Sequence, residues 1–140
     1  AKDPELARAI CQGIYEVDPA LVLLGQPGSQ MLKEARKLGL KVANEVFADR
    51  AYEEDGTLVA RSKAGSMITD EEEAVARVIK MIKEGKVTAI TGKEIEVQAD
   101  SVCVHGDGPK ALAFVKKIHK ALEEEGIQIR SLGGISRGRE

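Results

Sequence analysis

Residues with acidic, basic and phenolic side chains cluster where a predicted β-strand ends. The strand covers residues 40–47, and Glu45, Asp49, Arg50 and Tyr52 lie within it or just beyond it. Since side chains alternate along a strand, Glu45 lies on one face near the carboxyl end, and in a barrel that face could be the interior. A carboxylate beside an arginine could act as a general base or hold a polar substrate. A solvated Glu45 with a surface loop at Asp49 and Arg50 is the alternative interpretation.

A second cluster follows the predicted strand at residues 101–105. His105 ends that strand and Asp107 lies two residues later, so the pair could be a general acid or base with its orienting carboxylate, or two ligands of a metal. Asp107 could also cap the next helix. Cys103 shares a strand face with His105 at about 6–7 Å, with parallel side chains, a geometry that disfavours a cysteine–histidine nucleophile. A zinc site needs a third protein ligand, and His119 lies among lysines, where we expect a solvated helix face.

The turn GQPGSQ, residues 25–30, is the remaining strand end of interest. It opens a helix whose free N–H groups could bind an anion, but a plain connection between strand and helix is the simpler interpretation. The phosphate-binding patterns GxxxxGK[ST] and GxGxxG occur nowhere in the chain. The sequence therefore carries neither of these nucleotide signatures.

Predicted helices and strands alternate along the chain and must position these residues. A parallel α/β architecture follows from that alternation, and ligands of such folds bind at the carboxyl ends of the strands. Apolar residues at helical spacing predict the helices, and short apolar or alternating runs predict the strands. The helices are expected from Pro4 to about 17, from 30 to 38 after Ser29, from 70 to 84 after Thr69, and from Pro109 to 125; the strands at 20–24, 40–47, 101–105 and 127–132; and hairpins at 50–59 and 86–98.

Composition excludes several classes of function. The 140 residues carry 21 basic and 23 acidic side chains, for a net charge of -2, and only 2 tyrosines and 2 phenylalanines as aromatics, so we expect no nucleic-acid binding. The longest apolar run, residues 20–24, is too short to cross a bilayer, and the first residues lack the apolar stretch of a signal peptide. We therefore expect a cytoplasmic protein that does not bind membranes and whose Cys11 and Cys103 are reduced thiols.

Two runs of sequence carry a resemblance to a known family. The run EVFADRAYEEDGTLVARSKAG, residues 45–65, and the run CVHGDGPKAL, residues 103–112, resemble the LamB/YcsF family. The similarity extends from about residue 3 to residue 132, in the family's order and spacing. Members of this family serve as the A subunit of the prokaryotic ATP-dependent 5-oxoprolinase.

The resemblance implies a (β/α) barrel of the polysaccharide-deacetylase-like kind, able to hold a metal of unknown identity. The resemblance also implies that family members work with partner subunits B and C and use ATP to open 5-oxo-L-proline to L-glutamate. The missing phosphate-binding loop fits that implication, since phosphorylation of the lactam would fall to the partners. Arg50 could hold the substrate carboxylate through two parallel hydrogen bonds. Carried over position by position, the catalytic candidates are Glu45, Asp49, His105 and Asp107, and the substrate-binding candidates are Arg50, Tyr52 and Arg61.

Several segments of the family do not occur in this chain. Family members begin with an acidic DLNxDxGE-type segment and carry CGxHAGD-type and KPHGALYN-type runs, and none of these is present. A barrel of this class needs roughly 250 residues, so we expect the carboxy-terminal half of one barrel domain at residues 1–132 and a flexible tail at 133–140. Activity from this chain alone is not expected. Open sheet edges predict association with the missing half or with another copy in a homo-oligomer.

Two other functions remain open at this point. The chain could be a non-catalytic fragment or structural subunit that docks with partner chains, or a metal-dependent deacylase-like hydrolase that acts on another amide. The first residue is alanine rather than methionine, which favours a chain that begins within a longer fold. Activity in the presence of subunits B and C would separate the first alternative from an enzyme, and metal content would test the second.

Overall fold

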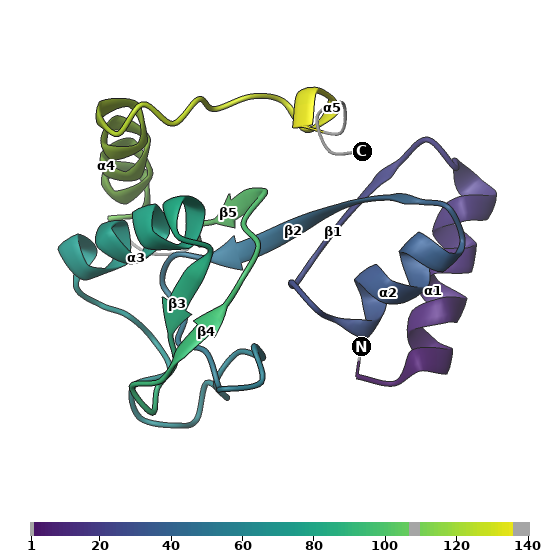
Figure 1. Ribbon diagram of the computed structural model, residues 1–140, viewed down its shortest axis with the longest axis horizontal. Coiled ribbons are helices and arrows are strands. Elements are labelled where there is room, and N and C mark those ends of the chain that lie inside the picture. Colours follow the sequence, from purple (N-terminus) through teal and green to yellow (C-terminus); the bar gives the residue numbers. More distant parts are fainter. Residues whose placement is uncertain (1, 107–109, 136–140) are drawn as a thin grey trace. The chain divides into compact units, whose positions relative to one another are not determined.

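A computed structural model describes residues 2–106 and 110–135, which form a mixed α/β fold with a parallel strand pair (Figure 1). The chain divides into two compact units, Ala1–Glu45 with Arg130–Glu140, and Val46–Ile129. In the described residues the strands do not close into a barrel. The elements are α1 (Pro4–Val17), β1 (Val22–Gly25), α2 (Gln30–Lys37), β2 (Lys41–Phe47), α3 (Glu71–Lys83), β3 (Lys86–Thr88), β4 (Glu94–Glu96), β5 (Ser101–Cys103), α4 (Ala111–Glu124) and α5 (Leu132–Ile135).

The first unit is built around the connection from β1 through α2 to β2. β1 pairs in parallel with the first four residues of β2, from Lys41 to Asn44. Ser29 caps α2, since its side chain accepts a hydrogen bond from the Leu32 N–H. Gly25 ends β1, and a Cβ there would lie 2.8 Å from the Leu32 side chain. A glycine at this position therefore allows α2 to pack closely against the end of the strand.

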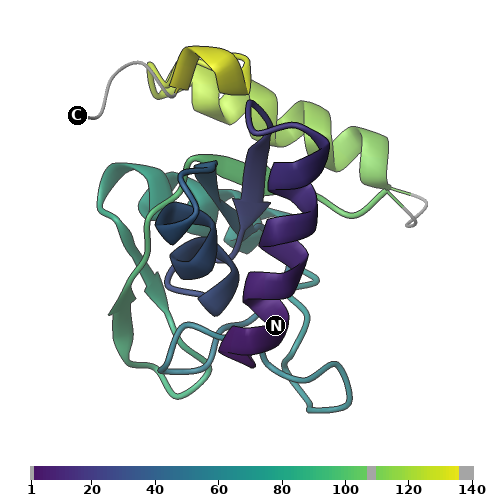
Figure 2. The same cartoon turned by 90° about the vertical axis from the view of Figure 1, so that its right-hand side faces the viewer.

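The core of the first unit lies between α1 and α2, which pack side by side in Figure 2. Cys11 of α1 is fully buried against Ala35 and Leu40. Its thiol donates to the Met31 carbonyl oxygen at 3.4 Å, and burial raises the pKa of this thiol. Both cysteines of the chain are reduced thiols, as the sequence predicted.

The core of the second unit lies under α3 and α4, which pack against each other (Figure 1). β3 and β4 form the predicted antiparallel hairpin, with Val87 opposite Ile95. The shorter hairpin at residues 50–59 is reduced to an isolated antiparallel bridge between Tyr52 and Leu58. The buried residues of this core are Val46, Ala48, Tyr52, Val75, Val78, Met81, Val87, Val97, Ile118 and Leu122.

The structure corrects several of the predicted bounds. β1 covers Val22–Gly25 rather than residues 20–24, and β5 ends at Cys103 rather than at residue 105. Asp70, not Thr69, caps α3, because the Asp70 side chain accepts from the Glu73 N–H. The predicted strand at 127–132 is wrong: residues 127–131 have no regular structure, and Leu132 begins α5. An alternating sequence does not become a strand without a neighbouring strand to bond with.

The predicted tail and the start of the last long helix fall partly outside the described residues. Residues 133–135 of the predicted tail 133–140 belong to α5, and the rest lie outside the described ranges. Pro109 also lies outside them, and α4 begins at Ala111. In the described part of the chain, no helix is long and apolar enough to cross a membrane.

The Asp70 cap provides a test of the local structure. We expect Asp70→Ala to lower the free energy of unfolding of the chain by about 1 kcal/mol, because the Glu73 N–H loses its acceptor. Thr69→Ala is the matched control, since Thr69 is exposed and precedes the cap. Urea denaturation followed by circular dichroism measures both variants. Equal losses of stability for the two variants would contradict the assignment of the cap.

Candidate functional site

The ends of β2 and β5 bring two of the predicted residues together. The Ala48 N–H donates to the Cys103 carbonyl oxygen at 3.2 Å, which aligns the chain after β2 with the chain after β5. Asp49 and His105 follow directly, and the His105 Nδ1 lies 2.8 Å and 3.0 Å from the two carboxylate oxygens of Asp49. The pair therefore joins the two sequence clusters, which are 56 residues apart.

The geometry of this pair sets the protonation of the imidazole ring. A carboxylate can only accept a hydrogen bond, so we assign the proton of the neutral ring to Nδ1. The other ring nitrogen, Nε2, then carries a lone pair and has no hydrogen-bond partner in residues 2–106 and 110–135. The side chain of His105 is 28% exposed and that of Asp49 is 15% exposed. His105 can therefore accept a proton from a small molecule while Asp49 holds the ring in place.

Phe47 lies against the imidazole ring and was missed by the sequence analysis. Its ring stacks on His105 with centroids 5.9 Å apart and planes 22° apart. The Phe47 backbone N–H donates to the Tyr52 hydroxyl oxygen at 2.9 Å. Phe47 lies two residues before Asp49 and two after Glu45 in the sequence, and this spacing next to two candidate acids is the signal that could have found it.

Tyr52 is fully buried, with a side chain in the core of the second unit. Its hydroxyl oxygen accepts the Phe47 N–H, and its carbonyl oxygen accepts the Ile90 N–H at 2.8 Å. These contacts connect the end of β2 with the loop that follows and with the β3–β4 hairpin. The role of Tyr52 in binding substrate stays a prediction.

Arg50 points its guanidinium into the loop between β2 and α3. The residue is only 7% exposed, and its Nη2 donates to the Val59 carbonyl oxygen at 2.7 Å. Arg77 of α3 donates in turn to the Arg50 carbonyl oxygen at 2.8 Å, and burial lowers the pKa of Arg77. The Nε atoms of both arginines are buried without a hydrogen-bond partner in the described residues. The two arginines fix the backbone next to Asp49.

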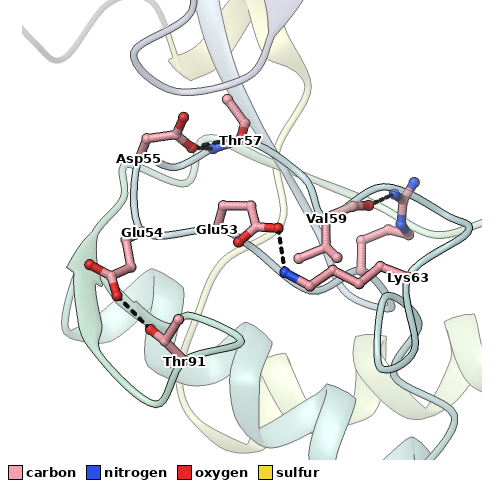
Figure 3. A network of polar contacts seen from close by, with 8 residues as sticks. Glu53, Glu54, Asp55, Thr57, Val59, Lys63 and Thr91 are labelled. Atoms are coloured by element: carbon pink, nitrogen blue, oxygen red, sulfur yellow. Dashed lines mark hydrogen bonds and ion pairs between the residues drawn. The ribbon is translucent and has the colours of Figure 1, made fainter.

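Further polar contacts hold the same loop (Figure 3). Lys63 pairs with Glu53 at 3.1 Å, and the Thr91 hydroxyl donates to Glu54 at 2.9 Å. Lys93 also pairs with Glu54 at 3.1 Å. The hydrogen bond from Thr91 and the charge of Lys93 lower the pKa of the Glu54 carboxyl. The loop thus has an ordered internal structure next to the Asp49–His105 pair.

The remaining predicted residues are less informative. Glu45 is a half-buried residue of β2 and belongs to the first unit. Arg61 is exposed in the loop, and its carbonyl oxygen accepts from the Ser66 hydroxyl at 3.2 Å. Asp107 lies outside the described residues. His119 is exposed and pairs with Glu123 on α4 at 3.5 Å, which confirms the predicted solvated face.

The donor set for a metal is incomplete in the described residues. Asp49 and His105 supply two possible ligands, but no group of three or more histidine, cysteine, aspartate or glutamate residues in those ranges could hold a metal ion. A protein metal site of the zinc type needs at least three protein ligands. We therefore derive no step of the chemistry through a metal.

Comparison with known proteins assigns the family. The LamB/YcsF family model matches residues 1–137. The chain belongs to the LamB/YcsF family. It is 68% identical over 134 residues to the 5-oxoprolinase A subunit of Clostridium beijerinckii, covering 96% of this chain and 52% of that protein. It is 52% identical over 134 residues to the 5-oxoprolinase A subunit of Staphylococcus carnosus, covering 96% of this chain and 53% of that protein.

A solved structure supports the fold of this LamB/YcsF chain. The lactam utilization protein from Thermus thermophilus superposes with a TM-score of 0.85 at 44% sequence identity. The match covers 94% of this chain and 52% of that one. The chain therefore spans about half the length of the curated relatives and of the solved structure that it matches.

The tautomer of His105 can be measured directly. We expect ¹⁵N NMR of the chain to show the neutral His105 ring protonated at Nδ1, because Asp49 accepts from that nitrogen. Asp49→Ala should remove this preference. The chain has only 2 histidines, so a His119→Gln variant assigns the signals and His119 serves as the internal control. A ring protonated at Nε2 in the unaltered chain would contradict the assignment.

The two tyrosines provide a second matched test. Tyr52→Phe should lower the free energy of unfolding by about 1–3 kcal/mol, because the part-buried Phe47 N–H loses its acceptor. Tyr15→Phe should have little effect, since Tyr15 is 40% exposed on α1. Chemical denaturation compares the two variants with the unaltered chain. If Tyr52→Phe is no more destabilising than Tyr15→Phe, the hydroxyl does not hold the Phe47 backbone.

Proposed function

We propose that this chain forms part of the A subunit of a 5-oxoprolinase, which hydrolyses the activated lactam ring of 5-oxo-L-proline to L-glutamate. Membership of the LamB/YcsF family and the names of its relatives support the substrate class. The observation that carries the proposal is the hydrogen-bonded pair of Asp49 and His105, with an imidazole nitrogen left to accept a proton. The chemistry implies a cytoplasmic reaction, since ATP is consumed.

The lactam must be activated before water can attack it. An amide carbonyl resists water, and transfer of the γ-phosphoryl group of ATP to its oxygen makes the carbonyl carbon more electrophilic. The sequence lacks both nucleotide signatures, so we assign the phosphoryl transfer to partner subunits B and C. ATP is then a cosubstrate of the complex, and this chain contributes to the hydrolytic half of the reaction.

His105 is the proposed general base for the attacking water. Its Nε2 takes a proton as the water oxygen bonds to the activated carbon, and Asp49 stabilises the resulting imidazolium. The C–N bond of the ring then breaks, and the ring nitrogen takes up a proton to become the amine of glutamate. A second water hydrolyses the acyl phosphate that remains and releases inorganic phosphate. The complete reaction therefore consumes the lactam, ATP and two waters and yields glutamate, ADP and inorganic phosphate.

Substrate binding falls to the cations of the same loop. Arg50 is the proposed partner of the substrate carboxylate, and its buried Nε has no other acceptor in the described ranges. Arg61, which is exposed in the loop, is a further candidate for this carboxylate. Tyr52 would act on the site through Phe47, whose N–H it holds. Glu45 and Asp107 remain proposed acids of the complete site.

The complete site would lie in a longer polypeptide. We propose that these residues are the carboxy-terminal half of a (β/α) barrel. This proposal is supported by the coverage of the relatives, since the chain matches only about half of the length of each of them. The parallel pairing of β1 with β2 is the local geometry that such a barrel requires. In this proposal the chain alone does not catalyse the reaction.

Reconstitution of the enzyme tests the proposed function. The complete polypeptide to which residues 1–140 belong is assayed with subunits B and C for glutamate release that depends on 5-oxoproline and ATP. We expect His105→Ala and Asp49→Asn to lower kcat by about a hundredfold to ten-thousandfold, the usual contribution of a general base. Arg50→Ala should raise KM for 5-oxoproline.

His119→Ala is the matched control for this assay. It removes the other histidine of the chain from an exposed position on α4, so glutamate release should be unchanged. The proposal fails if Asp49→Asn, Arg50→Ala and His105→Ala all retain full activity, or if the complete polypeptide releases no glutamate with its partners.

A further inference from the structure

Phe47 is a half-buried aromatic residue that the hydrophobic cores do not use. The chain has 2 phenylalanines, and the other one, Phe114 of α4, packs against the core of the second unit. Among residues 2–106 and 110–135, Phe47 belongs to neither core cluster. Its ring lies instead against the imidazole ring of His105, with centroids 5.9 Å apart. Core packing therefore does not account for an aromatic side chain at this position.

The Asp49 carboxylate fixes one nitrogen of the His105 ring but not the plane of the ring. The Nδ1 atom lies 2.8 Å and 3.0 Å from the two carboxylate oxygens, so this contact holds that nitrogen alone. Nε2 does not lie on the line of the hydrogen bond, and rotation of the ring about that line moves Nε2 to a new position. The χ2 torsion of histidine is broad and does not by itself prevent such a rotation.

The stacked ring of Phe47 restricts this rotation. Aromatic rings attract each other in offset-stacked arrangements with centroids roughly 4.5–7 Å apart. The ring of Phe47 and the imidazole of His105 lie within that range, and their planes differ by 22°. Rotation of the imidazole plane would separate the two faces and lose the contact. Asp49 thus holds the tautomer of the ring, and Phe47 holds its plane.

Two hydrogen bonds hold the backbone that carries the Phe47 ring. The Phe47 N–H donates at 2.9 Å to the hydroxyl oxygen of Tyr52, which is fully buried. The N–H of the next residue, Ala48, donates to the Cys103 carbonyl oxygen at 3.2 Å. Cys103 lies two residues before His105. The backbone on both sides of the ring pair is therefore fixed, as a positioning contact requires.

We propose that Phe47 is a positioning residue, which sets the plane of the His105 ring and so directs Nε2 toward the water that attacks the lactam. The proposal rests on the proposed function, in which His105 is the general base. Phe47 acts through His105 and contributes nothing to the binding of 5-oxoproline. Its loss therefore affects kcat and not KM, because only the orientation of the reacting groups changes.

The order of the His105 ring tests this role in the chain itself, without the reaction. Relaxation of ¹³C nuclei in the ring gives the order parameter of its C–H bonds. Phe47→Leu should lower this order parameter, because leucine is apolar but has no flat face to stack on the imidazole. The proton should stay on Nδ1, since Asp49 still accepts it. Phe47→Tyr keeps an aromatic ring and should keep the order of the unaltered chain.

Kinetics of the complete polypeptide with subunits B and C test the same role in the reaction. Phe47→Leu should lower kcat for glutamate release by about tenfold to a hundredfold and leave KM for 5-oxoproline unchanged, because a misplaced base reacts more slowly. Phe47→Tyr should keep kcat within about threefold of the unaltered enzyme, since the stacking is retained.

Phe114→Leu is the matched control for both measurements. It makes the same exchange in the same unit, at a half-buried ring that packs against the core. The order parameter of the His105 ring and kcat should therefore stay at the values of the unaltered protein. Urea denaturation followed by circular dichroism shows how much each exchange lowers stability and confirms that both variants fold.

Three results would overturn the proposal. One is an order parameter of the His105 ring that Phe47→Leu does not change. Another is an equal fall of the order parameter or of kcat in Phe47→Leu and Phe114→Leu, since a general loss of packing would then be the cause. The third is a raised KM with an unchanged kcat, since Phe47 would then bind the substrate.

The two measurements also separate this proposal from the proposed function. A loss of ring order in Phe47→Leu alone supports Phe47 as the residue that orients His105. If the unaltered complete polypeptide then releases no glutamate with subunits B and C, the proposed function fails while the orientation of the ring by Phe47 stands.

Discussion

The hydrogen bond from the Ala48 N–H to the Cys103 carbonyl oxygen is the contact on which the site depends. It fixes the register of two segments that are far apart in the sequence. A shift of one residue would turn the side chains that follow to opposite faces. Asp49 would then no longer meet His105. The candidate chemistry of this LamB/YcsF chain is therefore set by backbone pairing before any side chain takes part.

Around this contact the protein uses buried polar side chains to hold the backbone. Arg50 and Arg77 each donate to a carbonyl oxygen, and the Tyr52 hydroxyl accepts a backbone N–H. Burial of a guanidinium is costly, so the contacts that Arg50 and Arg77 make with the loop backbone point to a requirement for a rigid loop. Substrate-binding loops need such rigidity when the groups they carry must be placed within fractions of an ångström.

The sequence was sufficient to predict the four long helices and the segments that carry the candidate acids and base. The helical spacing of apolar residues predicted α1 to α4 close to their observed bounds. The predicted strand ends placed Asp49 and His105 on the correct segments. The sequence could not show that Asp49 and His105 contact each other, because pairing between distant strands leaves no local pattern in the sequence. Tyr52 was interpreted from its charged neighbours, but its burial depends on packing in three dimensions. The alternation at 127–132 failed for the same reason, since a strand needs a partner.

The burial of Cys11 has a consequence for the motions of the first unit. A thiol with a raised pKa and no exposed surface reacts slowly with alkylating reagents in the folded chain. Reaction becomes possible when α1 separates from α2 and exposes the sulfur. The rate of modification at Cys11 therefore reports how often the two helices separate. Cys11 is therefore an internal probe of local unfolding in the first unit.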